Sequence, residues 1–147
     1  LGMHNIPNPG ETLNTFGADQ SKYIDGGKTN RNNILIQQWV KGVSIDSLVY
    51  KYKLDCPDFI KIDVDGHENH VIDGAKQVLK SQKVKSWVIE LTLDNTIDKI
   101  TLLMKKNGYT AVQDFDHYPG YKIKTIDRVF VRDDFLSKWN YFSENWK

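Results

Sequence analysis

The regular alternation of strand-like and helix-like segments after Pro57 is the feature that most constrains the fold of this chain. Residues 58–64 form a short run rich in β-branched and aromatic side chains that ends just before Gly66, which predicts a strand. Apolar residues then recur at helical spacing between Glu68 and Lys80, which predicts a helix with one buried face. The remaining predicted elements are a strand at 87–93, a helix at 94–107 that ends at Gly108, and strands at 109–115 and 126–132.

This order of elements predicts an α/β fold. Strands that alternate with helices pair in parallel through right-handed crossovers, whereas the last two strands are close enough in sequence to form an antiparallel hairpin at one edge of the sheet. We therefore expect a mostly parallel sheet with helices on both faces. The aromatic-rich tail at 135–147 is predicted to be a helix that packs on the sheet.

The first 33 residues differ from the rest of the chain. They show little periodic apolar pattern and contain many residues that favour turns, among them several Gly, Pro and Asn. A predicted strand within 34–43 and a short capped helix at 44–50 follow. We therefore predict an irregular N-terminal segment over 1–33 and a second region over 34–147.

Composition narrows the class of partner. Among the 147 residues, 20 Lys and Arg balance 19 Asp and Glu, so the net charge of +1 gives little electrostatic attraction to nucleic acid or to an anionic membrane. No apolar stretch reaches the roughly 18 residues of a membrane-spanning helix. The single cysteine, Cys56, cannot form an internal disulfide, which favours a cytoplasmic location. We expect a small-molecule partner, with no nucleic acid and no membrane.

Charged residues interrupt the two strands that should lie at the centre of the sheet. Lys61 and Asp63 lie in the first of these strands, Glu90 lies in the second, and Glu68 opens the helix between them. Central strands of a covered parallel sheet are almost wholly apolar, so these charges need a reason. Because neighbouring parallel strands end at the edge where such sheets bind ligands, we expect the four side chains to share one cleft. The alternative is a structural ion pair, for example between Lys61 and Glu90, that fixes the strand register.

Several ordered motifs resemble the FkbM family of S-adenosylmethionine-dependent methyltransferases. The main motif is Asp-Phe-Ile-Lys-Ile-Asp-Val-Asp-Gly-His-Glu at 58–68, where a predicted strand leads into a predicted helix. The accompanying motifs are Val-Ile-Asp-Gly-Ala at 71–75, Leu79, Val-Ile-Glu-Leu at 88–91, Asn-Gly-Tyr at 107–109 and the upstream Val-Ser-Ile-Asp-Ser-Leu at 43–48. The resemblance covers residues 34–132 and implies part of a class I, Rossmann-like methyltransferase sheet, with strands four to seven and the last strand inserted antiparallel.

The resemblance implies O-methylation of a hydroxyl group on a small molecule or a sugar. Asp63 is then the candidate general base or acceptor-positioning residue, and Lys61 is the candidate group that polarises the acceptor oxygen or keeps Asp63 ionised. Glu68 and Glu90 are expected to orient Lys61 or to bind hydroxyl groups of the acceptor.

The turn after the first charged strand supplies the expected substrate-binding residues, Asp65 and His67. Other interpretations use the same turn. A divalent ion held by Asp63, Asp65 and Glu90 is one alternative, although the main interpretation assigns no metal. Asp63-Val-Asp65 also resembles the Asp-x-Asp element of glycosyltransferases that hold a nucleotide sugar through a metal. His67 and His70 lack the spacing of a zinc-binding His-Glu-x-x-His helix.

The resemblance also defines what the cofactor requires. Methyltransferases of this class hold S-adenosylmethionine on a glycine-rich turn after the first strand and bind its ribose with an acidic residue after the second strand. Neither feature precedes residue 58 in this sequence. We therefore expect the chain to represent the C-terminal half of the domain and to bind the cofactor weakly or not at all by itself. The alternative is a non-catalytic remnant whose open sheet edge pairs with a second copy to form a homodimer.

Overall fold

The structure, a computed structural model, describes residues 2–3, 14–15, 36–37, 41–64, 66–93, 95–116 and 125–145. The chain divides into two compact units, Leu1–Gly42 and Val43–Lys147. The predicted division between residues 33 and 34 stays a prediction, and the division between the compact units falls later.

The first unit contains a three-stranded antiparallel sheet of very short strands. Its order is β2-β1-β3, with β1 at Gly2–Met3, β2 at Asn14–Thr15 and β3 at Ile36–Gln37. β1 and β2 lie in the range for which the sequence predicts irregular structure. β3 occupies two residues of the strand predicted within 34–43.

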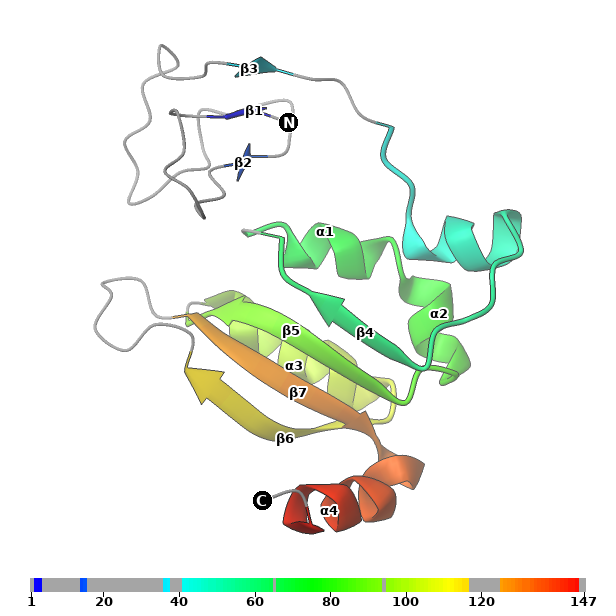
Figure 1. Cartoon of the computed structure of the whole chain (residues 1–147), viewed down its shortest axis with the longest axis vertical. Helices are drawn as coiled ribbons and strands as arrows, with labels where there is room; N and C mark the ends of the chain where they lie inside the picture. The colour runs from blue at the N-terminus through cyan, green and yellow to red at the C-terminus, as the bar shows by residue number, and fades with distance from the viewer. Residues whose placement is uncertain are drawn as a thin grey trace. The chain divides into compact units, whose positions relative to one another are not determined.

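The second unit is built on a four-stranded sheet in the order β4-β5-β7-β6 (Figure 1). β4 and β5 are parallel, whereas β7 runs antiparallel to both of its neighbours. The chain returns from β6 through a hairpin into the position beside β5, so three strands point one way but only one neighbouring pair is parallel. The predicted α/β class and the antiparallel hairpin are confirmed. The bounds are β4 at Phe59–Ile62, β5 at Ser86–Thr92, β6 at Tyr109–Asp116 and β7 at Thr125–Arg132.

The helices follow the sequence prediction with one difference. A helical segment at Ser47–Lys51 precedes β4, and the single helix predicted between β4 and β5 is broken into two short ones. Further along the chain, Gly108 has a φ of +78° and ends a helix at the predicted position, because a left-handed residue there favours glycine. The bounds are α1 at Glu68–Asp73, α2 at Lys76–Ser81, α3 at Asn95–Lys106 and α4 at Leu136–Asn145.

The break between α1 and α2 is caused by a segment from upstream in the sequence. A Cβ added at Gly74 would lie 3.0 Å from the Cβ of Ser44, which is tighter than most real contacts, so a larger residue here would push the two segments apart. The Asp46 N–H donates to the carbonyl of Gly74 at 2.9 Å. The Asp46 carboxylate in turn accepts hydrogen bonds of 2.9–3.1 Å from the N–H groups of Gln77 and Val78. A residue about thirty positions upstream therefore caps α2.

The apolar core lies on one face of the sheet. Trp87, Ile89 and Leu91 alternate along β5, are at most 1% exposed and belong to one cluster with buried residues of α1, α2 and α3. In Figure 1, α3 passes behind β5 and β7. The alternation of buried and half-buried residues along β5 therefore indicates a strand with one fully buried face.

Among the described residues, α4 covers part of the opposite face of the sheet. Val129 and Val131 of β7 point away from the main core, because they alternate with the core residue Phe130, yet they are 2% and 0% exposed. α4 follows β7 after a short turn at Asp133–Phe135 and packs against it. The tail therefore forms the predicted helix on the sheet.

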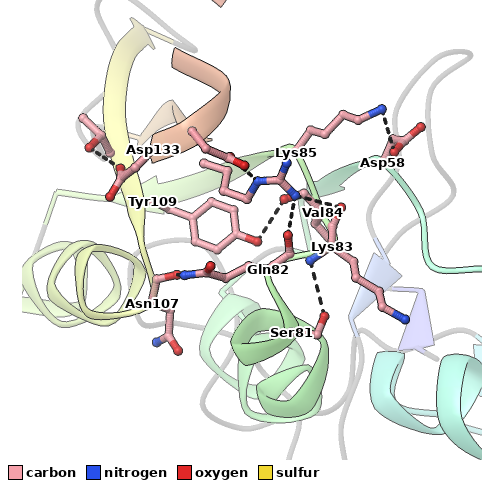
Figure 2. A network of polar contacts seen from close by, with 12 residues as sticks. Asp58, Ser81, Gln82, Lys83, Val84, Lys85, Asn107, Tyr109 and Asp133 are labelled. Atoms are coloured by element: carbon pink, nitrogen blue, oxygen red, sulfur yellow. Dashed lines mark hydrogen bonds and ion pairs between the residues drawn. The ribbon is translucent and has the colours of Figure 1, made fainter. Parts of the chain in front are cut away.

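A polar network fixes the end of the sheet where β5 begins (Figure 2). The Tyr109 hydroxyl donates to the carbonyl of Val84 at 2.9 Å, and the Gln82 side chain donates to the carbonyl of Asn107 at 3.0 Å. The Arg132 guanidinium donates to the carbonyl of Gln82. Two of these contacts satisfy backbone carbonyls of the loop that enters β5, and the third links this loop to the start of β6, so the contacts hold this end of the sheet together.

Within the residues that the structure describes, no helix combines the length and the apolar composition needed to cross a membrane.

Candidate functional site

The strand register brings charged side chains together on the sheet face opposite the main core. Ile60 and Ile62 of β4 pack with the core, so Lys61 and, by the same alternation, Asp63 lie on the other face. Lys61 is the register partner of Val88, two residues before Glu90 on the same face of β5. Glu90 pairs directly with Asp127 of β7. Lys61, Asp63, Glu90 and Asp127, called the acidic face cluster below, therefore meet near the carboxyl ends of β4 and β5.

Lys61 links two carboxylates within this cluster. Its Nζ lies 3.1 Å from Oδ2 of Asp63 and 3.4 Å from Oδ2 of Asp127. The side chains of Lys61 and Asp63 are 51% and 39% exposed, whereas that of Asp127 is only 15% exposed. Solvent therefore reaches Lys61 and Asp63 from the open face, while Asp127 contacts the lysine from the sheet.

The carboxylates set the protonation state of Lys61. The hydrogen bond from Lys61 to Asp63 raises the pKa of the lysine above its ordinary value of 10.5, burial opposes this shift, and the charge of Asp127 adds to it. Lys61 is therefore a cation at neutral pH, and it acts as an electrostatic partner and hydrogen-bond donor, not as a base.

Glu90 and Asp127 occupy directly opposed positions on neighbouring antiparallel strands. Like charges in such positions repel each other across about 5 Å, so a nearby cation stabilises the arrangement. Lys61 is that cation for Asp127. The cluster places three carboxylates and one ammonium group together, which suits the binding of several hydroxyl groups by charge-assisted hydrogen bonds.

Glu68 organises the turn that follows β4. It is only 8% exposed, and its Oε1 accepts hydrogen bonds from the N–H groups of Val64 at 3.2 Å and Gly66 at 3.1 Å. Gly66 has a φ of +90°, a left-handed conformation that favours glycine. The carboxylate therefore holds the backbone of the turn beside Asp63. The predicted role of Glu68 in orienting Lys61 or binding the acceptor stays a prediction.

The substrate-binding roles predicted for Asp65 and His67 stay predictions, and only His67 is among the described residues. His67 is half-buried at the start of α1, and its Nδ1 lies 3.3 Å from Nδ1 of His70. Asp65 lies outside the described residues, so its predicted role and the alternatives that need it, the divalent ion and the Asp-x-Asp element, stay predictions. In the described part of the chain, no group of three or more His, Cys, Asp or Glu is arranged to hold a metal ion.

Sequence reasoning missed Asp127. The signal was present, because a charged residue inside a strand is the feature that singled out Lys61, and Asp127 lies inside β7. The order of the predicted elements placed this strand in a hairpin at the edge. The family resemblance implied that the last strand is inserted antiparallel, but the charge of Asp127 was not considered in that position. The insertion of β7 between β5 and β6 makes Asp127 a residue of a central strand.

A second ion pair of β7 lies on the opposite face of the sheet and away from this cluster. Arg128 donates two hydrogen bonds of 2.7 Å to the carboxylate of Asp114 and one of 2.9 Å to the hydroxyl of Thr101. The bidentate contact with Arg128 lowers the pKa of Asp114 below its ordinary value. This pair joins β6, β7 and α3, so it has a structural role.

Comparison with known protein families identifies the family to which this sequence belongs. A family model described as the methyltransferase FkbM domain matches residues 4–111, which is more than half of the chain. The match begins before residue 34, where the motif resemblance begins, and it includes β4, β5 and the turn held by Glu68, but not β7 with Asp127. Comparisons with curated proteins and with solved structures gave no match. The chain belongs to the FkbM methyltransferase domain family.

Proposed function

We propose that this chain forms the acceptor-binding side of an S-adenosylmethionine-dependent O-methyltransferase that acts on a hydroxyl group of a small molecule or a sugar. The observation that carries the proposal is the position of Lys61, which bridges Asp63 and Asp127 near the carboxyl ends of β4 and β5. This end of an α/β sheet is where ligands bind, and the chain belongs to a methyltransferase family.

Asp63 is the residue that contacts the acceptor in this proposal. Its carboxylate is 39% exposed on the open face and accepts the proton of the acceptor hydroxyl as the oxygen becomes the nucleophile. Lys61 forms an ion pair with Asp63, and its second ion pair with Asp127 fixes the direction of the ammonium group. Glu90 adds a further carboxylate beside Asp127 for neighbouring hydroxyl groups.

The described residues do not fit the cofactor that the family uses. The only turn of this sheet that joins a strand to a helix through a glycine is the one after β4, and it contains Gly66 alone and leads into the six-residue α1. The turn between β5 and α3 contains no glycine. The backbone cradle for the nucleotide is therefore not among the described residues, and we derive no step through the cofactor. In this proposal the cofactor binds to residues other than the described ones.

Methyl transfer tests the proposed role of Asp63. The protein product that contains this chain is incubated with S-adenosylmethionine and a panel of sugars and hydroxylated small molecules, and S-adenosylhomocysteine formation is measured. We expect Asp63→Asn to lower kcat by about 100-fold or more, the range for a lost general base, without changing the affinity for S-adenosylhomocysteine. Asp73→Asn is the matched control, because Asp73 is an exposed aspartate of α1 paired with Lys76.

Two results would contradict this proposal. Unchanged turnover of Asp63→Asn would show that Asp63 is not the general base. The absence of any methylated product across the panel would contradict the proposed methyltransferase activity itself. Calorimetric titration of S-adenosylhomocysteine into the 147-residue chain separates the two parts of the proposal. Micromolar binding by this chain would show that it contains the cofactor site, whatever the role of Asp63.

A second candidate function rests on the edge of the sheet. Among the described strands, β4 pairs only with β5, and Phe59 at its start is 61% exposed. An uncovered strand edge pairs readily with another chain, so a non-catalytic module that forms a homodimer through β4 is the alternative. Light scattering over a range of concentrations tests it. A dimer that Phe59→Lys dissociates supports the alternative, and a monomer at every concentration contradicts it.

A further inference from the structure

Two histidines at the start of α1, His67 just before the helix and His70 within it, face each other through the same ring atom. Nδ1 of His67 lies 3.3 Å from Nδ1 of His70, and the ring centroids are 5.5 Å apart with a tilt of 38° between the planes. In the metal-free chain one ring can donate a hydrogen bond to the other at this distance, and the tautomers of the two rings decide which one donates. The ion pairs of Lys61 are formed with Asp63 and Asp127, and the proposed methyl transfer does not use the histidine pair.

The distance between the two Nδ1 atoms matches a metal site. Zinc binds imidazole nitrogen at 2.0–2.1 Å, and two such ligands at a tetrahedral angle are separated by about 3.3–3.4 Å. Imidazole nitrogen is also a preferred ligand of copper and nickel, but magnesium and calcium prefer oxygen. We propose that His67 and His70 form a two-ligand site for a divalent transition metal ion, with water or an exogenous ligand in the remaining positions.

The backbone holds both ligands in place before any metal binds. The N–H of His70 donates to the carbonyl of His67 at 2.9 Å, which fixes the two residues one helical turn apart. Glu68 holds the preceding turn through the N–H of Gly66. The N–H of Gly74 donates to the carbonyl of His70 at 3.1 Å. Because the ligands lie on a short ordered segment, little conformational entropy is lost on binding. His70 is exposed, so a metal ion reaches the pair from solvent.

Calorimetric titration of ZnCl₂ into the 147-residue chain at pH 7.5 tests this site. We expect one zinc ion per chain. Loss of a residue that merely supports a ligand already weakens metal binding by about 10- to 100-fold, so His67→Gln and His70→Gln should each weaken it at least tenfold. The matched control is the double variant His4→Gln/His117→Gln, which removes the other two histidines of the chain and should change the affinity less than twofold.

The pH dependence gives a second measurement. Protons compete with metal ions for imidazole nitrogen, so zinc affinity should fall as the buffer is made more acidic than pH 7.5. MgCl₂ should not bind at this pair. The proposal is overturned if wild-type protein shows no zinc binding at millimolar concentration, if both single variants bind zinc as wild type does, or if magnesium competes equally. Far-UV circular dichroism of the variants confirms that they fold.

Discussion

The cap that Asp46 provides to α2 offers the sharpest test of how this fold is held together. The first N–H groups of a helix have no partner within the helix, and Asp46 supplies one carboxylate for those of Gln77 and Val78. Loss of a cap costs about 0.5–2 kcal/mol. The upper end applies here because the acceptor is charged and Val78 is 0% exposed, so water replaces the carboxylate poorly. We expect Asp46→Ala to lower the free energy of unfolding by about 2 kcal/mol.

Thermal and urea unfolding, followed by far-UV circular dichroism, measure this loss. At about 4 °C per kcal/mol, Asp46→Ala should lower Tm by about 8 °C. Asp46→Asn retains one acceptor oxygen and should lose about half as much. Asp55→Ala is the control, because it removes the same charge from an exposed position near β4. If Asp46→Ala and Asp55→Ala unfold within about 0.5 kcal/mol of each other, the typical scatter of surface substitutions, the capping explanation for the helix break is wrong.

Three further predictions follow from individual contacts. Asp63→Asn should lower the pKa of Lys61 more than Asp127→Asn does, because the hydrogen bond to Asp63 is the largest cause of the raised value, and NMR titration of the lysine side chain measures the difference. The pKa of Asp114 is lower in the folded chain than its ordinary value of 3.8, so the ionised Asp114 stabilises the fold above pH 3.8, and this stabilisation is lost as the pH falls through the folded-state pKa. In Asp114→Asn, the free energy of unfolding should therefore depend less on pH below pH 3.8. An unchanged acid transition would contradict this. Tyr109→Phe should lower the free energy of unfolding in urea by about 1 kcal/mol, because it removes the hydroxyl that donates to the buried carbonyl of Val84. An unchanged free energy of unfolding would refute this prediction.

Much of the second unit was predictable from local patterns. The alternation of buried and half-buried residues in β5 and the helical spacing in α3 each arise from burial on one face, and both are visible in the sequence. Gly108 was predictable because its left-handed conformation has a strong residue preference. The break at Gly74 was not, since it depends on Ser44 and Asp46, which dock there from a distant part of the sequence.

The candidate site also contains residues that local patterns predict and one residue that they do not. Lys61 and Asp63 are two residues apart, so strand periodicity alone places them on one face, and in the structure they form an ion pair. Asp127 lies 66 residues from Lys61, and its position depends on β7 being inserted beside β5. Periodicity predicts which face a residue occupies, but the partner of that residue follows from strand order, which local patterns do not determine.

The two candidate functions concern the same edge of the sheet. A strand that pairs with the outer side of β4 would lie about 4.8 Å away, which brings its side chains within reach of Lys61 and Asp63. The site on the open face is therefore not independent of what covers the edge. If another strand of the same domain pairs there, it becomes a wall of the acceptor site. If a second copy pairs there, it narrows access to Asp63. Dimerisation through β4 and catalysis by Asp63 would then compete, so the oligomeric state must be known before any loss of activity is assigned to a residue of the acidic face cluster.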